Sequence, residues 1–425
     1  MKNEADGALG RDIARSVNDV YAALPVRLKP EIRPNGTLEW TILAGFVMED
    51  EHTLKCVAAG VGMKCLPESR LPLQGDMLHD THAEILARRA FTKWLLLQLQ
   101  LSEVEEGSTS SSTSNGISPY LCIRDSKYTF RENVKVHLYV SALPCGDASM
   151  AYTADHQRSD DAAYYSAIPL LQGADVGVVA RGRFDYTRLG ALRTKPGRAD
   201  AGSTISHSCS DKLTTYSLLG VQGGLLANIM HPVYIDTMVI GGVADNREKY
   251  SNECHRSLYQ RLNGSVDLKD LQEYTFHQPR ILFTDVPFYH AKEEVEGRAG
   301  GAGVQPATHC ANYVAGDTPL EAELVIGGLK NGNFKRRGAQ TYGCKYRSRL
   351  CKLDIMRHFL SLRCVQENFD TDASTTYRDL KHAETARTYR TLKTLIRTPP
   401  SAFADWIVSD TRLSMFDREG VSGGA

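Results

Sequence analysis

The spacing of apolar residues along the chain predicts helices and strands that alternate through its first two thirds. Apolar side chains recur every three or four residues over 13–24 and over 83–101, which is typical of helices with one buried face. Segments 39–47, 53–60 and 134–141 are instead rich in residues that strands favour. Such alternation favours an α/β fold, in which helices cover a sheet.

The chain beyond residue 200 continues this pattern and then becomes more helical. A helix is expected over 211–219, ended by Gly220, and a strand over 233–240. Two basic helices are expected over 347–362 and 376–396. The last third is therefore expected to be largely helical and basic.

Low-complexity sequence interrupts the pattern at about residues 102–119, where serine and threonine dominate. Such a composition cannot bury enough apolar surface to fold, so we expect a disordered insertion there. No internal repeat is evident. We therefore expect one domain over 11–415, with flexible tails at 1–10 and 416–425.

Composition argues against a membrane or a secreted protein. The chain has 425 residues, of which 42% are hydrophobic and 24% are charged, as in ordinary globular proteins. No apolar run approaches the roughly 18 residues of a membrane span, and the first residues lack the apolar segment of a secretory signal. We expect an intracellular protein. Residence in the nucleus or the cytoplasm stays open, because the basic cluster at 335–337 is short.

Charge and cysteine content narrow the possibilities further. Fifty basic residues balance 50 acidic ones, so any RNA-binding face must be a local concentration of charge. The ten cysteines are scattered along a chain without a leader, which favours buried thiols and a few metal ligands over disulfides.

Four residues of the types that build catalytic zinc sites occur in a recognisable order. His82 is followed two residues later by Glu84, and Cys145 and Cys209 lie farther along the chain. One imidazole and two thiolates can hold a zinc ion and leave a fourth position for water. A lone His-x-Glu arises often by chance, and a lone Cys is usually a packed residue. The order His-x-Glu, Pro-Cys and a further Cys, however, is that of zinc-dependent nucleobase deaminases, with the Glu as proton carrier.

Each expected ligand lies at the expected start of a helix. His82 precedes the long helix, and Cys145 follows Pro144, which favours a first helical turn. Cys209 precedes another helix, for which Ser210 is the expected N-cap. The unpaired N–H groups of a helix start stabilise negative charge, as thiolate ligands require.

On these and further motifs the chain resembles the editase family of adenosine deaminases acting on RNA and tRNA, and within it the tRNA-specific adenosine deaminase 1 group. The second cysteine lies far from the first, unlike the Pro-Cys-x-x-Cys deaminases. The resemblance extends from about Ile13 to Trp406. The matching motifs are Gly62-x-Lys64-Cys65, Asp80-x-His82-Ala83-Glu84-Ile85 with Arg88-Arg89, Pro144-Cys145-Gly146-Asp147-Ala148, Leu192-Arg193-Thr194-Lys195, Ser208-Cys209-Ser210-Asp211-Lys212-Leu213, Gly220-Val221-Gln222-Gly223, Ser257-Leu258-Tyr259-Gln260-Arg261, Ser348-Arg349-Leu350-Cys351-Lys352 and Tyr377-x-x-x-Lys381.

The resemblance implies a fold and a reaction. The implied fold is a cytidine-deaminase-like layered core, a mixed sheet flanked by helices, elaborated by a basic, largely helical C-terminal part around a buried polyphosphate. The implied reaction is hydrolytic deamination of adenosine to inosine. Zn²⁺ would be held by His82, Cys145 and Cys209, and Glu84 would act as proton donor and acceptor.

The implied substrate is tRNA. In the resembled group the target is adenosine 37, beside the anticodon of tRNA-Ala. The editors of duplex RNA carry double-stranded-RNA-binding domains ahead of the deaminase, and we expect none in this chain, because few residues precede its first helix. A loop base also leaves its stack at a lower cost than a duplex base.

The resemblance also implies a second bound group, inositol hexakisphosphate, buried within a shell of basic residues. Lys195 and Lys212 would connect this anion to Asp80 and the catalytic water. The positions that match the shell are Arg88, Arg89, Lys212, Lys352, Tyr377, Lys381, Tyr389, Lys393 and Trp406.

Charge pattern alone favours a different interpretation of the basic residues in 376–396, namely a solvated or tRNA-facing helix. The family match reverses this preference for Lys381 and Lys393. The chain also departs from the duplex editors, with His79 in place of an asparagine and Thr215 in place of an arginine, so fewer contacts to the anion are expected.

Two other functions stay open at this stage. A cytidine or free-nucleoside deaminase would share the chemistry, but would leave the basic last third without a purpose. A catalytically silent RNA-binding protein with structural zinc is the other. The presence of Glu84 argues against it, because a structural zinc site needs no proton carrier.

Overall fold

The computed structural model describes most of the chain, in seven segments: residues 2–103, 118–156, 179–184, 187–195, 202–317, 321–332 and 341–422. The expected insertion at 102–119 lies mostly outside the described residues, and the basic cluster at 335–337 lies wholly outside them. Across the described segments, no helix combines the length and the apolar character that crossing a membrane requires.

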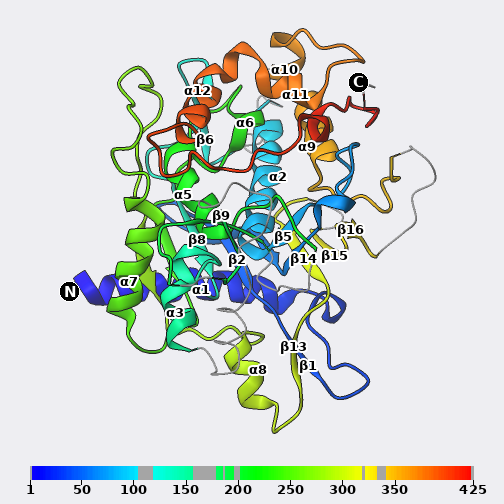
Figure 1. Ribbon diagram of the computed structural model, residues 1–425. Helices are drawn as coiled ribbons and strands as arrows, with labels where there is room; N and C mark the ends of the chain where they lie inside the picture. Colours follow the sequence, from blue (N-terminus) through cyan, green and yellow to red (C-terminus); the bar gives the residue numbers. More distant parts are fainter. Residues whose placement is uncertain are drawn as a thin grey trace.

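An eight-stranded mixed sheet lies at the centre of the molecule (Figure 1). Strands β8, β11 and β12 run parallel to one another, and the other neighbours pair antiparallel. This mixed sheet with flanking helices confirms the predicted α/β class. In spatial order the strands are β12 (Arg280–Phe283), β11 (Thr237–Ile240), β8 (Lys135–Val140), β2 (Leu43–Glu49), β3 (Leu54–Val61), β14 (Cys310–Val314), β15 (Ala322–Ile326) and β16 (Leu329–Lys330).

One long helix packs on each face of the sheet and builds a hydrophobic core there. Strand β2 contributes side chains to both cores. Leu43 packs among apolar residues of α1 (Lys2–Ala23). Phe46, whose side chain points the other way, stacks on Phe91 of α2 (Ala83–Glu103) with 4.4 Å between ring centroids. Because side chains alternate between the two faces of a strand, α1 and α2 cover opposite faces of the sheet.

Gly60 of β3 lets the start of α2 lie against the sheet. A Cβ atom there would lie 2.5 Å from both the carbonyl oxygen of Ala83 and the amide nitrogen of Ala87. Only glycine permits so close an approach. The position of the first turn of α2, which carries Glu84, is therefore fixed by the sheet.

Shorter helices gather around the far half of α2, in the part of Figure 1 that carries the labels α6, α9 and α12. These helices are α5 (Cys209–Leu219), α6 (Gly223–Leu226), α9 (Lys352–Ser361), α10 (Arg363–Asn368), α11 (Tyr377–His382) and α12 (Arg387–Ile396). The other elements are helices α3 (Met150–Asp155), α7 (Arg247–His255) and α8 (Lys292–Arg298), and the strand pairs β1 (Leu38–Trp40) with β13 (Val304–Pro306), β4 (Met63–Cys65) with β5 (Asp80–His82), β6 (Leu121–Arg124) with β7 (Lys127–Phe130), and β9 (Val179–Arg181) with β10 (Leu192–Thr194).

Four expected elements differ from the structure. The helix expected over 347–362 begins only at Lys352, with Cys351 as its N-cap. The strand expected over 39–47 is two strands, because β1 leaves the main sheet to pair with β13. The helix expected over 376–396 is divided into α11 and α12 by a 3₁₀ turn at Glu384–Ala386. The strand expected over 233–240 begins only at Thr237, where pairing with β8 starts.

The expected flexible tails at 1–10 and 416–425 are wrong for the residues that the structure describes. Helix α1 already begins at Lys2, and Asp6 forms an ion pair with Arg280 of β12 at 2.6 Å. At the other end, Phe416 is fully buried and stacks on Tyr377. Both ends are therefore held by tertiary contacts that local sequence does not reveal.

Candidate metal centre and active site

The first ligand and the expected proton carrier lie at the junction of β5 and α2. His82 is the last residue of β5, and Glu84 lies in the first turn of α2. The amide of Ala83 donates to the carbonyl oxygen of Gly62 at 2.9 Å, which joins the junction to β3. Glu84 is 4% exposed.

The structure brings the three predicted metal ligands together. Nδ1 of His82 lies 3.7 Å from Sγ of Cys145 and 3.7 Å from Sγ of Cys209, and all three ligand atoms lie within 4.8 Å of one another. Sulfur and nitrogen atoms bound to one tetrahedral zinc ion, at about 2.3 and 2.1 Å, lie about 3.6 Å apart. The spacing and the soft donor set therefore fit zinc.

The two loops that carry the cysteines interlock. Gly146 has φ +99°, and a Cβ atom there would lie 2.2 Å from Oγ of Ser208. The amide of Cys209 donates to Sγ of Cys145 at 3.3 Å, and Ser210 donates through its amide to the carbonyl oxygen of Cys145 at 3.0 Å. Each loop thus positions the ligand of the other.

Two local predictions at the ligands are wrong. The N-cap of α5 is Ser208, whose Oγ accepts from the amide of Asp211 at 3.1 Å, and not Ser210, whose hydroxyl bonds to the other cysteine loop. Cys145 lies ahead of the 3₁₀ turn Asp147–Ser149 rather than in a helical turn, because Gly146 has a conformation that no helix accommodates. The ligands nevertheless meet as expected.

A buried ion cluster lies beside the metal ligands. Asp80 accepts from Nζ of Lys195 at 2.7 Å, from Nζ of Lys212 at 2.5 Å and from the hydroxyl of Ser206 at 2.8 Å. Nζ of Lys195 also donates to Sγ of Cys209 at 3.3 Å. The predicted relay residues Asp80 and Lys195 are therefore in contact with a ligand, and Ser206 is a member that the sequence motifs did not reveal.

The two buried carboxyl groups near the metal ligands differ in pKa. Asp80 is kept charged by its lysine partners, whereas Glu84 holds a proton more readily. Burial opposes ionisation of Asp80, but Lys195 and Lys212 hold its pKa well below the usual range. Burial raises the pKa of Glu84, and the nearby Cys145 raises it further. A hydrogen bond from Cys209, with His82 and Lys195 close by, lowers the pKa of the Cys145 thiol, whereas burial and the neighbouring Cys145 raise the pKa of the Cys209 thiol.

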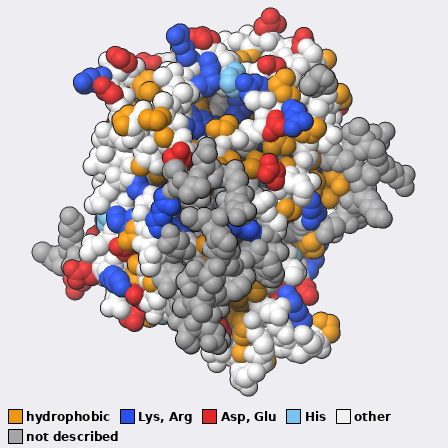
Figure 2. Space-filling model, in the orientation of Figure 1, with side chains coloured by type: hydrophobic (Ala, Val, Ile, Leu, Met, Phe, Trp, Pro, Cys, Tyr) orange, Lys and Arg blue, Asp and Glu red, His pale blue; other side chains and the backbone are white. Residues whose placement is uncertain are grey.

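The predicted basic shell also assembles, at the far half of α2. Figure 2 shows Lys and Arg side chains around a hollow at the end of the molecule where α6, α11 and α12 lie. Burial, with Lys381 and Arg89 nearby, lowers the pKa of Lys352 to about 7. Burial and the same kind of neighbours hold the pKa of Lys393 well below its usual range. In the described part of the chain, no carboxylate forms an ion pair with any member of the set Arg88, Arg89, Lys352, Lys381 and Lys393.

The remaining predicted shell residues border this cluster. Lys381 lies over the ring of Tyr377, 5.1 Å from its centroid, and the ring of Tyr389 lies against Gly224 of α6. Trp406 stacks on His207 at 4.0 Å, and Arg397 lies 4.8 Å over the same indole. Lys212 points instead to Asp80, and so lies between the shell and the metal centre.

A layered α/β fold in which an imidazole and two thiolates converge on one point, with a buried glutamate two residues after the imidazole, defines a nucleobase deaminase. The model of the adenosine-deaminase (editase) domain matches residues 58–410, which is most of the chain. The chain belongs to this family and is an adenosine deaminase.

Named relatives agree with this assignment. The chain is 29% identical over 340 residues to tRNA-specific adenosine deaminase 1 of Saccharomyces cerevisiae, covering 78% of each chain. It is 33% identical over 298 residues to the protein of the same name from Schizosaccharomyces pombe, covering 67% of this chain and 70% of the relative. It is also 28% identical over 319 residues to double-stranded RNA-specific editase B2 of Mus musculus, covering 73% of this chain and 37% of the relative.

Proposed function

We propose that the protein deaminates adenosine to inosine by hydrolysis in tRNA, with adenosine 37 beside the anticodon of tRNA-Ala as its target. The convergence of His82, Cys145 and Cys209 is the observation that carries this proposal. The proposed catalytic unit is a single editase domain over 11–415.

The residues of the site suit a hydrolytic deamination. A zinc ion held by His82, Cys145 and Cys209 would act as a Lewis acid that activates water for attack at C6 of adenine. Glu84 would take the proton from that water and return protons to N1 and to the leaving amine. Burial raises the pKa of Glu84, which suits a carboxyl group that gains and loses a proton in each turnover.

Lys195, kept charged by Asp80, would place a positive charge beside the ligand Cys209. Lys195 keeps its proton because Asp80 and Cys209 outweigh the burial that would lower its pKa. Its ammonium group, 3.3 Å from Sγ of Cys209, stabilises the thiolate form of that ligand.

The named relatives support tRNA as the substrate. The match covers 78% and 70% of the two relatives named as tRNA-specific, against 37% of editase B2. A base in a tRNA loop is also easier to extrude than a paired base, which suits a reaction that requires the base to enter a pocket.

We propose inositol hexakisphosphate as the second bound group. The support is that the cations of the basic shell form no ion pair with a described carboxylate. Buried ammonium and guanidinium groups without carboxylate partners repel one another and need a dense anion. Nε2 of His79 is buried without a hydrogen-bond partner among the described residues, and Lys352 and Arg89 contribute to lowering its pKa. His79 is therefore a further proposed donor to the anion. The other ligands proposed are Arg88, Arg89, Lys212, Lys352, Tyr377, Lys381, Tyr389, Lys393 and Trp406.

The proposal is tested by inosine formation with the purified, zinc-loaded protein. Four substrates are compared: tRNA-Ala, tRNA-Ala with guanosine at position 37, free adenosine and free cytidine. Inosine is measured as the product of adenosine and uridine as the product of cytidine, and we expect turnover of tRNA-Ala alone. Turnover of a free nucleoside in place of tRNA would support the nucleoside-deaminase alternative, and no turnover of any substrate by a zinc-loaded protein would support a silent RNA-binding protein.

A further inference from the structure

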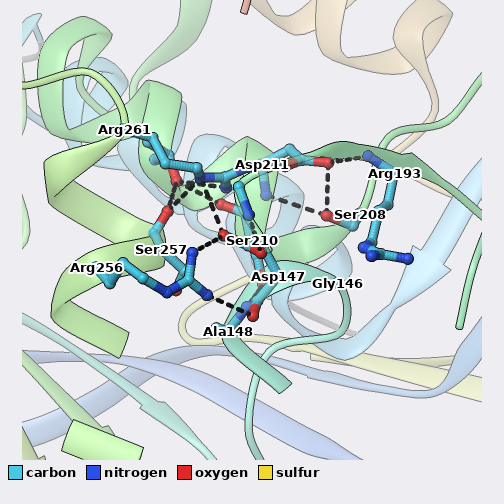
Figure 3. A network of polar contacts seen from close by, with 12 residues as sticks. Gly146, Asp147, Ala148, Arg193, Ser208, Ser210, Asp211, Arg256, Ser257 and Arg261 are labelled. Carbon is cyan, nitrogen blue, oxygen red and sulfur yellow. Dashed lines mark hydrogen bonds and ion pairs between the residues drawn. The ribbon is translucent and has the colours of Figure 1, made fainter. Parts of the chain in front are cut away.

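We infer that Arg261 is a positioning residue that sets the separation of the two cysteine ligands. This inference rests on the proposed zinc site. Arg261 is not a metal ligand itself. It lies between Asp147 and Asp211, and each of these aspartates follows a cysteine ligand by two residues (Figure 3).

The guanidinium group reaches both carboxylates from one side. Nη1 of Arg261 donates to Oδ1 of Asp211 at 2.7 Å, and Nε lies 3.5 Å from Oδ2 of Asp147. Further bonds fix the plane of the group, from Nη2 to Oγ1 of Thr214 at 3.2 Å and from Nε to the carbonyl oxygen of Ser257 at 2.6 Å. A guanidinium group offers this fork of donors, and an ammonium group does not.

The burial of these three side chains makes the bridge a strong constraint. Both aspartates have no exposed surface, and the Arg261 side chain is 5% exposed. The guanidinium also lies over the ring of Phe403, 4.7 Å from its centroid. Without Arg261, Asp147 would keep only Arg256 and Asp211 would lose its guanidinium partner, so the link between the two buried carboxylates would be lost.

Each aspartate belongs to the loop that carries its cysteine, two residues away, and further hydrogen bonds hold its carboxylate in place. Oδ2 of Asp211 accepts from the hydroxyl of Ser208 at 2.7 Å and from the amide of Arg193 at 2.9 Å. Oδ1 of Asp147 accepts from the amide of Gly190 at 2.8 Å. A movement of either carboxylate is therefore passed to the loop that carries Cys145 or Cys209.

Arg256 provides a matched control within the same network. Its Nη1 donates to Oδ2 of Asp147 at 2.8 Å, and its Nη2 donates to Glu253 at 2.8 Å. Arg256 carries the same charge and touches the same aspartate, but it forms no contact with Asp211. Of the two arginines, Arg261 is the one that contacts both aspartates.

The test measures metal binding by the full chain in Arg261→Lys, Arg261→Met and Arg256→Met. Zinc affinity is obtained by competition with a chromogenic chelator, and ligand geometry from the absorption bands of the cobalt(II)-substituted protein. We expect zinc affinity to fall 10- to 100-fold in both Arg261 variants, as for other residues that orient metal ligands. We also expect shifted cobalt bands in both. Arg256→Met should keep the wild-type spectrum, with affinity within about threefold.

The results separate this inference from the proposed function. Unchanged zinc affinity and an unchanged cobalt spectrum in Arg261→Lys, with circular dichroism showing a folded chain, would overturn the inference, whether or not Arg261→Met folds. An equal loss in Arg256→Met would overturn it too, because the effect would then be that of any cation in the network. Wild-type zinc binding without inosine formation would contradict the proposed function and leave this inference standing.

Discussion

The metal centre is buried and the basic shell is half-buried; both are rich in charge, but their charges are balanced in different ways. At the metal centre, Asp80 is paired with Lys195 and Lys212, and Arg261 with Asp147 and Asp211. In the shell, the cations face one another. The chain itself supplies the counter-charges of the first region, whereas the described residues offer no carboxylate ion pair to the cations of the second. The first region should therefore be stable in the folded chain alone, and the second should gain stability when the proposed anion binds.

The largest effect is expected from Glu84→Gln at the metal centre. The substitution keeps the shape of the side chain and removes its proton transfer, so inosine formation should fall about 10²- to 10⁴-fold. Zinc content should stay at the wild-type value, because Glu84 is not a ligand. Activity is measured in single turnover with tRNA, and zinc by elemental analysis. Full activity in this variant would contradict the assigned role.

The next largest effect is expected when the negative charge of Asp80 at the metal centre is removed. Asp80→Asn would leave Lys195 and Lys212 buried beside a neutral amide, so we expect a loss of about 3–5 kcal/mol of unfolding free energy. Denaturant unfolding measures the loss, and Asp372→Asn on an exposed turn is the control, expected to change little. An Asp80 variant as stable as the wild type would show that the two lysines do not depend on this carboxylate.

A smaller effect of opposite sign is expected in the shell. Lys352→Met removes a half-buried cation that has no carboxylate partner among the described residues, so it should stabilise the anion-free protein by about 2 kcal/mol. The same substitution should weaken binding of inositol hexakisphosphate, and so lower the stability of the loaded protein. Thermal unfolding with and without the polyphosphate measures both. Destabilisation in both states would contradict the contrast between the two regions.

The difference in stability between Lys352→Met and the wild type should also depend on pH. Lys352 holds its proton up to about pH 7 in the folded chain, against 10.5 as the ordinary value. Between these values the unfolded chain binds more protons, so stability rises with pH, by about 1.4 kcal/mol per pH unit at most. The advantage of Lys352→Met in the anion-free protein should therefore shrink from pH 7 to pH 9, and bound polyphosphate should remove the trend. If the stability difference between Lys352→Met and the wild type stayed constant from pH 7 to pH 9, the pKa of Lys352 in the folded chain would not be lowered to about 7.

The sequence predicted the metal ligands more reliably than their surroundings. His82, Cys145 and Cys209 are identified by residue type and order, which the chemistry of zinc constrains. The interlocking of Gly146 with Ser208, and the N-cap at Ser208 rather than Ser210, depend on contacts between loops distant in the chain. Local sequence carries no signal for such contacts.

The same distinction holds for the fold. The helix at 83–101 was predicted closely because a long periodic apolar face leaves little ambiguity. The division of 376–396 and the ordered first residues were not predicted. In both, tertiary contacts overrode local pattern, as the ion pair of Asp6 with Arg280 shows.

The most direct test of the central claim is X-ray absorption at the zinc edge of the purified protein. The account predicts one zinc ion per chain with two sulfur ligands, one imidazole nitrogen and one further light atom, and the loss of one sulfur in Cys209→Ala. Four protein ligands, or a zinc environment unchanged in Cys209→Ala, would contradict it.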